Sequence, residues 1–435
     1  MGFVPGFIGG VAADEPRAAL VGRDVLSAGG NAMDAAVAVY FTMAVTRPSV
    51  AGLGASGQCV LFNEKAKRVE ALDFAAPQGV PGGPRGMYAL HAKYGRLRWE
   101  QMVTPAENLA RFGFLASRGF VRDLAAASAV LADNPALARL YAGPGGRMPA
   151  EGDRMTQLDL AATLGLLRRA PGEFYSGAFL QSYVAAAQAA GIALTPEAMR
   201  GYAPQFRETL QVRHDLLIHH FAPTPGGAVA SRMWQALAVD GQYRAAAPAA
   251  RPALLAETQA KAVAAATLGL NEMPLSAPQA GASFVIADQD SNTVACAYSM
   301  GRAFGSGKVA GDSGIVLPAP IAGGEALAVA PMLSINPRVN KMFFAAASAG
   351  GAPAPAAEIL VALGAMVEAK PLADALAAPR SHWISSGRVA VEPQIPLATV
   401  NAFHCPEGLI SPGAEKPEAV CGIEADRRGF GLATR

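Results

Sequence analysis

The segment GASFVIAD, residues 281–288, begins a run in which apolar side chains recur with a period close to two, and the run continues to Tyr298. That period is typical of β-strands. The polar segment DQDSN, residues 288–292, interrupts the run and predicts a turn between two strand arms. The sequence therefore predicts an antiparallel hairpin in the second half of the chain.

Outside this hairpin, Ala- and Leu-rich stretches with a helical period alternate with short strand-like segments. Residues 17–46 read as helical, with a break at 29–31 (Gly-Gly-Asn) just before Asp34 that predicts the start of a second helix. Residues 105–112 predict a helix that begins at a proline. Residues 210–220 predict a strand. We expect a protein of mixed helix and sheet.

Composition restricts the class of protein. The chain has 435 residues, of which 51% are hydrophobic and 16% charged, so it has enough apolar material for a large core. A net charge of +2 without a basic patch argues against nucleic acid and anionic membrane surfaces as partners. No apolar run reaches the roughly 18 residues that span a bilayer. Residues 1–6 lack the features of a secretory signal, so we expect a cytoplasmic location.

The cysteines and histidines show no pattern of a metal or disulfide site. Four cysteines are too few and too scattered for a disulfide framework or a zinc site, so we predict buried or incidental thiols at Cys59, Cys296, Cys405 and Cys421. His219 and His220 are adjacent and would point to opposite faces of a strand. The other histidines have no ligand spacing. We expect neither a metal nor another cofactor.

Nine short motifs are spread along the chain. They are AGGNAMDAA (28–36), PAENLAR (105–111), EGDR (151–154), FYSG (174–177), TPGG (224–227), FGSG (304–307), AGDSGI (310–315), PMLS (331–334) and SAGG (348–351). Each motif alone is weak, but their order and spacing resemble the gamma-glutamyltranspeptidase family over nearly the whole chain. The resemblance implies an N-terminal nucleophile hydrolase fold, a four-layer αββα sandwich with two mainly antiparallel sheets.

In relatives of this family, one precursor cuts itself, and a Thr becomes the new N-terminus of the smaller subunit. That residue type is needed because its side chain attacks the preceding peptide carbonyl. The freed α-amine, with a pKa of about 7.7 to 8, then serves as the general base. The resemblance therefore divides this chain into a large-subunit-like region, 1–280, and a small-subunit-like region, 281–435, within one domain.

The nucleophile position, counted back from the turn at 288–292, falls on Gly281. The next family Thr corresponds to Ala282 and the family His to Ser283. Neither Gly281 nor Ala282 has a nucleophilic side chain, so we expect an uncleaved chain. Ser283 shares a strand face with position 281 but lies about 6.6 Å along the strand. Because catalytic groups must be held to roughly 0.5 Å, Ser283 is either a nucleophile reached by a strand slip or an ordinary strand serine.

Other positions keep part of the family site. Gly350 and Gly351 match the pair whose N–H groups form the oxyanion hole of relatives, although glycine also suits a purely conformational role. Ser299 falls where relatives have a Thr in contact with the nucleophile, and it is also an ordinary strand residue. Ser334 corresponds to the second of two serines that hold the substrate, and Leu333 replaces the first.

The residues that hold the glutamyl group in relatives are missing here. The segment with the carboxylate-binding Arg reads DFAAP at 73–77 and lacks it. Gly301 stands where relatives use an Asn, and VLPAPI at 316–321 has no acid for the α-amine. Arg302 is a new charge, which either binds an acidic ligand or is a solvated or structural residue. Arg85 is a weaker candidate of the same kind.

Two functions remain open at this stage. The first is a non-catalytic member of the family, a ligand-binding or assembly subunit that forms a homo-oligomer or a complex with another protein subunit. Its small-molecule ligand is not identified by the sequence. The second is an amide hydrolase or acyltransferase with a changed substrate, acting through Ser283 or Ser299.

Overall fold

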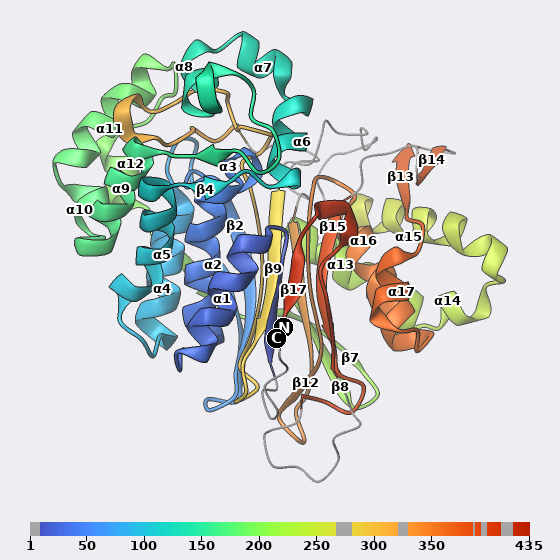
Figure 1. Ribbon diagram of the computed structural model, residues 1–435. Helices are drawn as coiled ribbons and strands as arrows, with labels where there is room; N and C mark the ends of the chain where they lie inside the picture. Colours follow the sequence, from blue (N-terminus) through green and yellow to red (C-terminus); the bar gives the residue numbers. More distant parts are fainter. Residues whose placement is uncertain (1–8, 267–280, 321–328, 386–387, 393–397, 410–420) are drawn as a thin grey trace.

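A computed structural model describes residues 9–266, 281–320, 329–385, 388–392, 398–409 and 421–435 of the chain. Two antiparallel sheets lie face to face at the centre, and helices cover the outer face of each sheet (Figure 1). The predicted four-layer αββα sandwich is therefore confirmed. The predicted boundary at 280 and 281 falls at the edge of residues 267–280, which lie outside the described residues.

The first sheet has seven strands, and every neighbouring pair in it is antiparallel. The predicted hairpin lies at its centre, because β9 and β10 are adjacent and joined by the turn at 288–292. In spatial order the strands are β17 (Leu432–Thr434), β1 (Gly10–Ala13), β9 (Gly281–Ala287), β10 (Thr293–Ser299), β2 (Ser56–Asn63), β3 (Arg68–Asp73) and β6 (Gln205–Arg207).

The second sheet has six strands, again all antiparallel. Its order is β16 (Gly422–Glu424), β15 (Thr399–His404), β12 (Lys341–Ala349), β11 (Val329–Asn336), β8 (Leu217–Phe221) and β7 (Leu210–His214). The segment 210–220, predicted as strand, forms the two strands β7 and β8. The chain turns at Asp215, which has a φ of 51°. Asp tolerates that conformation, and composition alone did not separate the turn from the strands.

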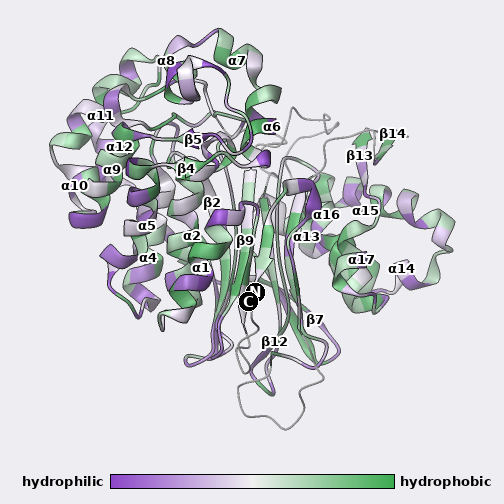
Figure 2. Ribbon diagram, in the orientation of Figure 1, coloured by the Kyte–Doolittle hydropathy of each residue, from purple (hydrophilic) through white to green (hydrophobic). Residues whose placement is uncertain are grey.

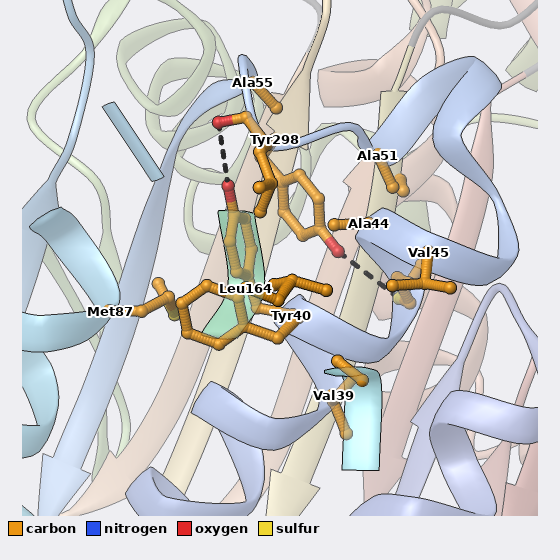
Figure 3. Packing of buried hydrophobic residues seen from close by; sticks show 14 of the residues in the cluster. Val39, Tyr40, Ala44, Val45, Ala51, Ala55, Met87, Leu164 and Tyr298 are labelled. Carbon is orange, nitrogen blue, oxygen red and sulfur yellow. Dashed lines mark hydrogen bonds between the residues drawn. The ribbon is translucent and has the colours of Figure 1, made fainter. Parts of the chain in front are cut away.

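Helix α2 (Ala32–Thr46) covers the first sheet and is buried over its whole length, as expected for a helix that is apolar all round. Its start was predicted correctly: the Asn31 side chain accepts hydrogen bonds from the N–H groups of Met33 and Asp34, and the Asp34 carboxylate accepts one from the Asn31 N–H. This reciprocal cap satisfies N–H groups that a helix start leaves unpaired. Tyr40 of α2 packs on Tyr298 of β10, with ring centroids 5.1 Å apart (Figure 3).

The other helices divide into two sets. On the side of the first sheet are α1 (Pro16–Ser27), α3 (Pro48–Ala51), α4 (Gly82–Tyr94), α5 (Trp99–Phe112), α6 (Arg118–Ala126), α7 (Ser128–Ala132), α8 (Pro135–Leu140), α9 (Leu158–Arg169), α10 (Glu173–Ser176), α11 (Ala178–Ala189) and α12 (Pro196–Gly201). On the side of the second are α13 (Pro225–Trp234), α14 (Gln242–Ala245), α15 (Arg251–Ala265), α16 (Ala354–Ala362) and α17 (Leu372–Ala377). Two small two-stranded antiparallel sheets, β4 (Phe114–Leu115) with β5 (Arg154–Met155) and β13 (Ser381–Ser385) with β14 (Arg388–Val391), lie outside the two large sheets.

Helix α5 corrects the prediction for 105–112. It begins at Trp99, so Pro105 lies inside it. An interior proline removes one helix hydrogen bond and costs about 3 kcal/mol. The extra turns bury Trp99, Met102 and Val103 against the core, and this burial offsets that cost.

An apolar core lies between the two sheets, and the strands of both sheets are coloured largely as hydrophobic in Figure 2. Many of its side chains are small, which allows the two sheets to approach closely. The alanines in it are Ala12, Ala222, Ala287, Ala295, Ala297, Ala345, Ala347 and Ala349.

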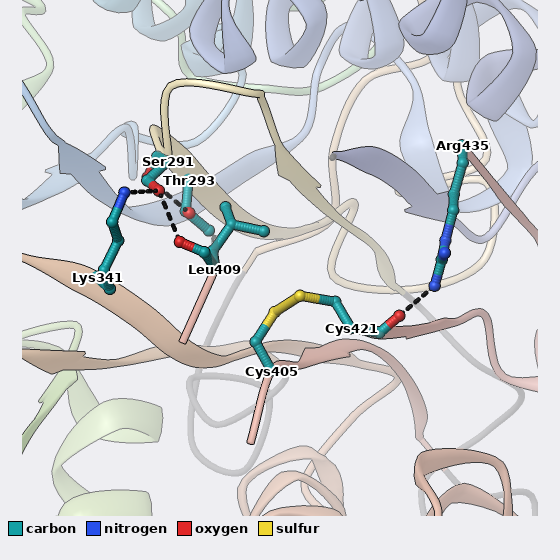
Figure 4. Close-up of a disulfide and its surroundings, with 7 residues drawn as sticks. All are labelled: Ser291, Thr293, Lys341, Cys405, Leu409, Cys421 and Arg435. Carbon is teal, nitrogen blue, oxygen red and sulfur yellow. Dashed lines mark hydrogen bonds between the residues drawn. A yellow bond between two sulfur atoms is a disulfide. The ribbon is translucent and has the colours of Figure 1, made fainter. Parts of the chain in front are cut away.

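The cysteines correct a second prediction, because all four form disulfides. Cys59 and Cys296 are directly opposite each other on β2 and β10 and are bonded. Cys405 and Cys421 are bonded across a separation of 16 residues, between the ends of β15 and β16 (Figure 4). The first pair is 237 residues apart in sequence. Only the strand order brings it together, so spacing gave no signal.

Thiol titration tests both bonds. The chain, purified in air-equilibrated buffer and unfolded in guanidinium, should show no free thiol before reduction and four after it. A sample reduced before unfolding is the control for complete reaction. Four reactive thiols in the unreduced sample would contradict the pairing.

Candidate active site

Strand pairing brings three of the predicted site residues together at one end of the sandwich. Gly281, the first residue of β9, is paired with Ser299, the last residue of β10. A Cβ atom built on Gly281 would lie 3.3 Å from the Gly350 nitrogen. The nucleophile position, the serine across from it and the first oxyanion glycine are therefore neighbours.

The place where a nucleophilic side chain would stand is already occupied. A Cβ on Gly281 would lie 2.9 Å from the Tyr298 carbonyl oxygen and 3.1 Å from the Ala349 Cβ. The first distance is shorter than packed carbon and oxygen atoms normally reach, and backbone cannot move away as a flexible side chain can. Position 281 thus lacks both a hydroxyl and the space to hold one.

Gly350 and Gly351 connect β12 to the start of α16. Their φ angles of 125° and 98° are ones that residues with a side chain rarely adopt, so the conformation itself requires glycine. The Gly350 N–H also lies close enough to position 281 to face a group bound there. Both readings of this pair, conformational and oxyanion-binding, are compatible with the geometry.

Ser299 is buried and its Oγ accepts a hydrogen bond from the Gly301 N–H at 2.9 Å. Ser299 is paired with Ser56 of the neighbouring strand β2. The Ser56 Oγ accepts a hydrogen bond from the Ala76 N–H at 3.2 Å. The segment 73–77 therefore lies beside this end of the sheet, where the resemblance places the glutamyl carboxylate. Its one charged residue, Asp73, lies 3.6 Å from Arg207, so it supplies no cation to bind a carboxylate.

A second segment beside the candidate site, residues 316–320, has no charged side chain. The Ala319 N–H donates to the Met300 carbonyl oxygen, and a Cβ on Gly301 would lie 3.1 Å from the Ala319 Cβ. Leu317 is fully buried. Residues 316–320 thus stand beside Gly301 with no charged side chain among them. An α-ammonium group would find no acid in this segment.

Ser283 belongs to a polar cluster between the two sheets. The Asp14 Oδ2 accepts hydrogen bonds from the Ser283 N–H (2.8 Å), the Ser283 hydroxyl (3.3 Å) and the Thr399 hydroxyl (3.0 Å). The Asn401 amide donates to Asp14 Oδ1 at 3.0 Å and to Ser283 Oγ at 2.8 Å. All four residues are buried. They connect the end of β1, strand β9 and strand β15 across the inter-sheet core.

Burial raises the pKa of the Asp14 carboxyl, and Arg47, Asn401, Ser283 and Thr399 oppose the rise. Arg47 is buried, donates to the Asp14 carbonyl oxygen at 2.9 Å and pairs with Asp123. Neither Asp14 nor Asn401 was predicted from the sequence as a site residue. An acid directly after a short buried strand and an Asn within an apolar strand are weak signals, which gain meaning only when the sheets are in contact.

Ser334 lies away from these residues. It is five positions along β11 from Val329, which is paired with Ala349, so about 16 Å separates it from the Gly350 end of the strand. Its hydroxyl is bonded to His219 Nδ1 at 2.8 Å, on the side of the outer helices. The structure therefore does not bring Ser334 into the candidate site.

His219, the partner of Ser334, gives a pH prediction. Burial lowers its pKa to about 3, with His214 and His220 adding to the effect, and its Nε2 has no partner among the described residues. In the unfolded chain the pKa is about 6.5. The unfolded state thus binds more protons, and stability present above pH 6.5 is lost as the pH falls. Between pH 7 and 5 this loss is about 2 kcal/mol.

Urea unfolding at the two pH values measures this loss. The His219→Gln variant should lose about 2 kcal/mol less than the unaltered chain over the same interval. Equal losses in both proteins would show that His219 is not the titrating group.

The two predicted arginines differ in their surroundings. Arg302 is exposed in the turn after β10, and its carbonyl oxygen accepts the Gly305 N–H at 2.8 Å. Arg85 stacks on Tyr175 at 4.0 Å and donates to the carbonyl oxygens of Met199 and Arg200. Arg85 therefore fits the structural reading.

Two features are absent from the described ranges, 9–266, 281–320, 329–385, 388–392, 398–409 and 421–435. There, no group of three or more His, Cys, Asp or Glu residues is placed to hold a metal ion. Nor does any helix of the described part have the length and apolarity to cross a bilayer.

A solved structure shares this architecture over the whole chain. The crystal structure of cephalosporin acylase from Bacillus halodurans superposes with a TM-score of 0.80 and 19% sequence identity, covering 100% of this chain and 97% of that one. The chain therefore has the fold of the N-terminal nucleophile hydrolases.

Sequence comparison identifies the family. The gamma-glutamyltranspeptidase profile matches residues 18–78 and 75–278, more than half of the chain. Glutathione hydrolase 3 of Arabidopsis thaliana is 28% identical over 252 residues, 52% of this chain but only 39% of that protein. The glutathione hydrolase proenzyme of Escherichia coli K12 is 25% identical over 473 residues, 86% of this chain and 81% of that protein. The chain belongs to the gamma-glutamyltranspeptidase family.

Proposed function

We propose that this chain is a non-catalytic member of its family, which uses the intact fold as a ligand-binding or assembly subunit. The observation that carries the proposal is Gly281, which has no nucleophile and no space for one beside Tyr298 and Ala349. The segments 73–77 and 316–320 add to it, because neither has a cation for a glutamyl carboxylate and 316–320 has no acid for an α-ammonium group. Under this proposal the chain is not cleaved between regions 1–280 and 281–435.

Two measurements test the absence of catalysis. Intact-mass spectrometry should find one chain of 44.5 kDa. A chromogenic γ-glutamyl anilide should be turned over no faster than in buffer. Turnover at ordinary enzyme rates, about 1 to 1000 per second, or two fragments divided near residue 281, would refute the proposal.

The assembly role has a separate test. A scaffold subunit should bury a sizeable surface against a second copy or another protein subunit. Light scattering of the purified chain and co-purification from its natural host would detect such a complex. A monomer without a partner would leave ligand binding as the proposed role, and would remove assembly.

An amide hydrolase or acyltransferase is the second candidate. The contact that favours it is the 3.3 Å separation between the Ser283 hydroxyl and the Asp14 carboxylate, a pairing of nucleophile and base. Gly350 and Gly351 would then stabilise the developing negative charge. Ser283 is fully buried, so β9 would have to move before a substrate could reach it. A fluorophosphonate probe that labels Ser283 or Ser299 stoichiometrically, and fails on the matching Ser→Ala variant, would support this candidate.

The cytoplasmic location predicted from the sequence stays a prediction. The two disulfides weigh against it, because cytosolic thiols are normally kept reduced. Trapping the thiols by alkylation in the natural host before lysis tests the point.

A further inference from the structure

A surface cavity of about 970 Å³ lies on the side of the first sheet, apart from Gly281 and its neighbours. Its volume is within the range of small-molecule sites. The lining comes from the start of α1, from β4 and the start of α6, and from the segment before β17, which lie near one another in Figure 1. Apolar residues in the lining include Leu20, Leu109, Phe114, Leu115 and Phe430.

The charged residues of the lining are three arginines and two glutamates. Arg17 and Arg427 are exposed, and neither guanidinium has an acidic partner among the described residues. Arg118 is paired with Glu151 at 3.0 Å. Glu15 is buried, and its carboxylate accepts the Ala18 N–H at the start of α1. Once Arg118 and Glu151 are paired, Arg17 and Arg427 remain to attract an anion, against the single buried carboxylate of Glu15.

Phe430 supplies an aromatic surface in the cavity. Its φ of 58° lies in the left-handed region, which a bulky side chain rarely adopts. The guanidinium groups of Arg122 and Arg118 lie 4.9 Å and 5.8 Å from its ring centroid. Strained residues of this kind persist where surrounding contacts hold them, and they are concentrated at ligand sites.

We propose that this cavity binds a small organic anion in which a carboxylate or similar anionic group is joined to an apolar or aromatic body. Guanidinium groups pair with carboxylates in a bidentate manner. The apolar lining and the Phe430 ring would cover the body of the ligand. The site uses none of the residues around Gly281, so it goes beyond the proposed function and holds whether or not the chain is catalytic.

Isothermal titration with three probes of equal tail length tests the site, with the two ionic probes below their micelle concentrations and the alcohol below its solubility limit. They are decanoate, decan-1-ol and decyltrimethylammonium. Decanoate should bind about tenfold or more tightly than decanol, a difference of about 1.4 kcal/mol, and decyltrimethylammonium should bind most weakly. Equal affinity for the three probes, or no binding of decanoate at millimolar concentration, would overturn the proposal.

Variants assign the binding to this cavity. The double variant Arg17→Gln, Arg427→Gln should lose about tenfold in decanoate affinity and keep its decanol affinity, because both side chains are exposed and their loss leaves the fold intact. Phe430→Gly should weaken both probes while it relieves the backbone conformation. Arg213→Gln, an exposed change on β7, is the control and should bind as the unaltered chain does. Unchanged decanoate binding in the double variant would place the ligand elsewhere and contradict the proposal.

Discussion

The Asp14→Ala variant should lose about 3–5 kcal/mol of unfolding free energy. Asp14 accepts four hydrogen bonds, from Ser283, Thr399 and Asn401, in a buried site between the sheets. Removing the carboxylate takes the acceptor from the Ser283 N–H and from the two hydroxyls, whereas the Asn401 amide keeps its bonds to Ser283. Each buried unpaired donor costs about 1–3 kcal/mol. The substitution also removes a negative charge near the buried guanidinium of Arg47.

Two variants show whether the loss comes from the polar contacts. Asp14→Asn keeps the shape and one acceptor, so it should cost less, about 1–2 kcal/mol. Asp24→Ala, an exposed change on α1, should stay within about 0.5 kcal/mol of the unaltered chain. Urea unfolding at pH 7 gives all three values. A loss below about 1 kcal/mol for Asp14→Ala would show that the cluster does not hold the sheets together.

Local patterns predicted the elements but not their contacts. The period of two and the turn at 288–292 located the β9–β10 hairpin, and the Gly-Gly-Asn break at 29–31 before Asp34 located the start of α2. Both depend on residues close in sequence. Helix α5 was predicted too short because Pro105 is usually a start signal, and burial on the sheet overrode that local preference.

Contacts between distant segments were the part that could not be predicted. Cys59 and Cys296 meet because β2 and β10 are neighbours, and Asp14 meets Asn401 because two sheets face each other. Ser334 was assigned to the site by its place in a motif. The register of β11 on β12 instead sets it about 16 Å along the strand from the Gly350 end. One-dimensional spacing carries no information on such register.

The Gly281→Thr variant should neither cut itself nor gain activity, and it should be destabilised by about 3 kcal/mol. Restoring the family nucleophile adds three side-chain atoms where a Cβ alone already lies 2.9 Å from the Tyr298 carbonyl oxygen and 3.1 Å from the Ala349 Cβ. Overpacking of a filled core typically costs 1–3 kcal/mol. The upper end applies because one obstacle is backbone within a paired strand.

Gly172→Thr is the matched control, since a Cβ at Gly172 meets no atom within 4 Å and the effect there should be under about 1 kcal/mol. Intact mass after prolonged incubation and urea unfolding are the two readouts. If Gly281→Thr released a fragment beginning at Thr and kept its stability, the strand must move easily by the width of a side chain. Position 281 would then accept a working nucleophile, and the closed packing around Gly281 could no longer support a non-catalytic role.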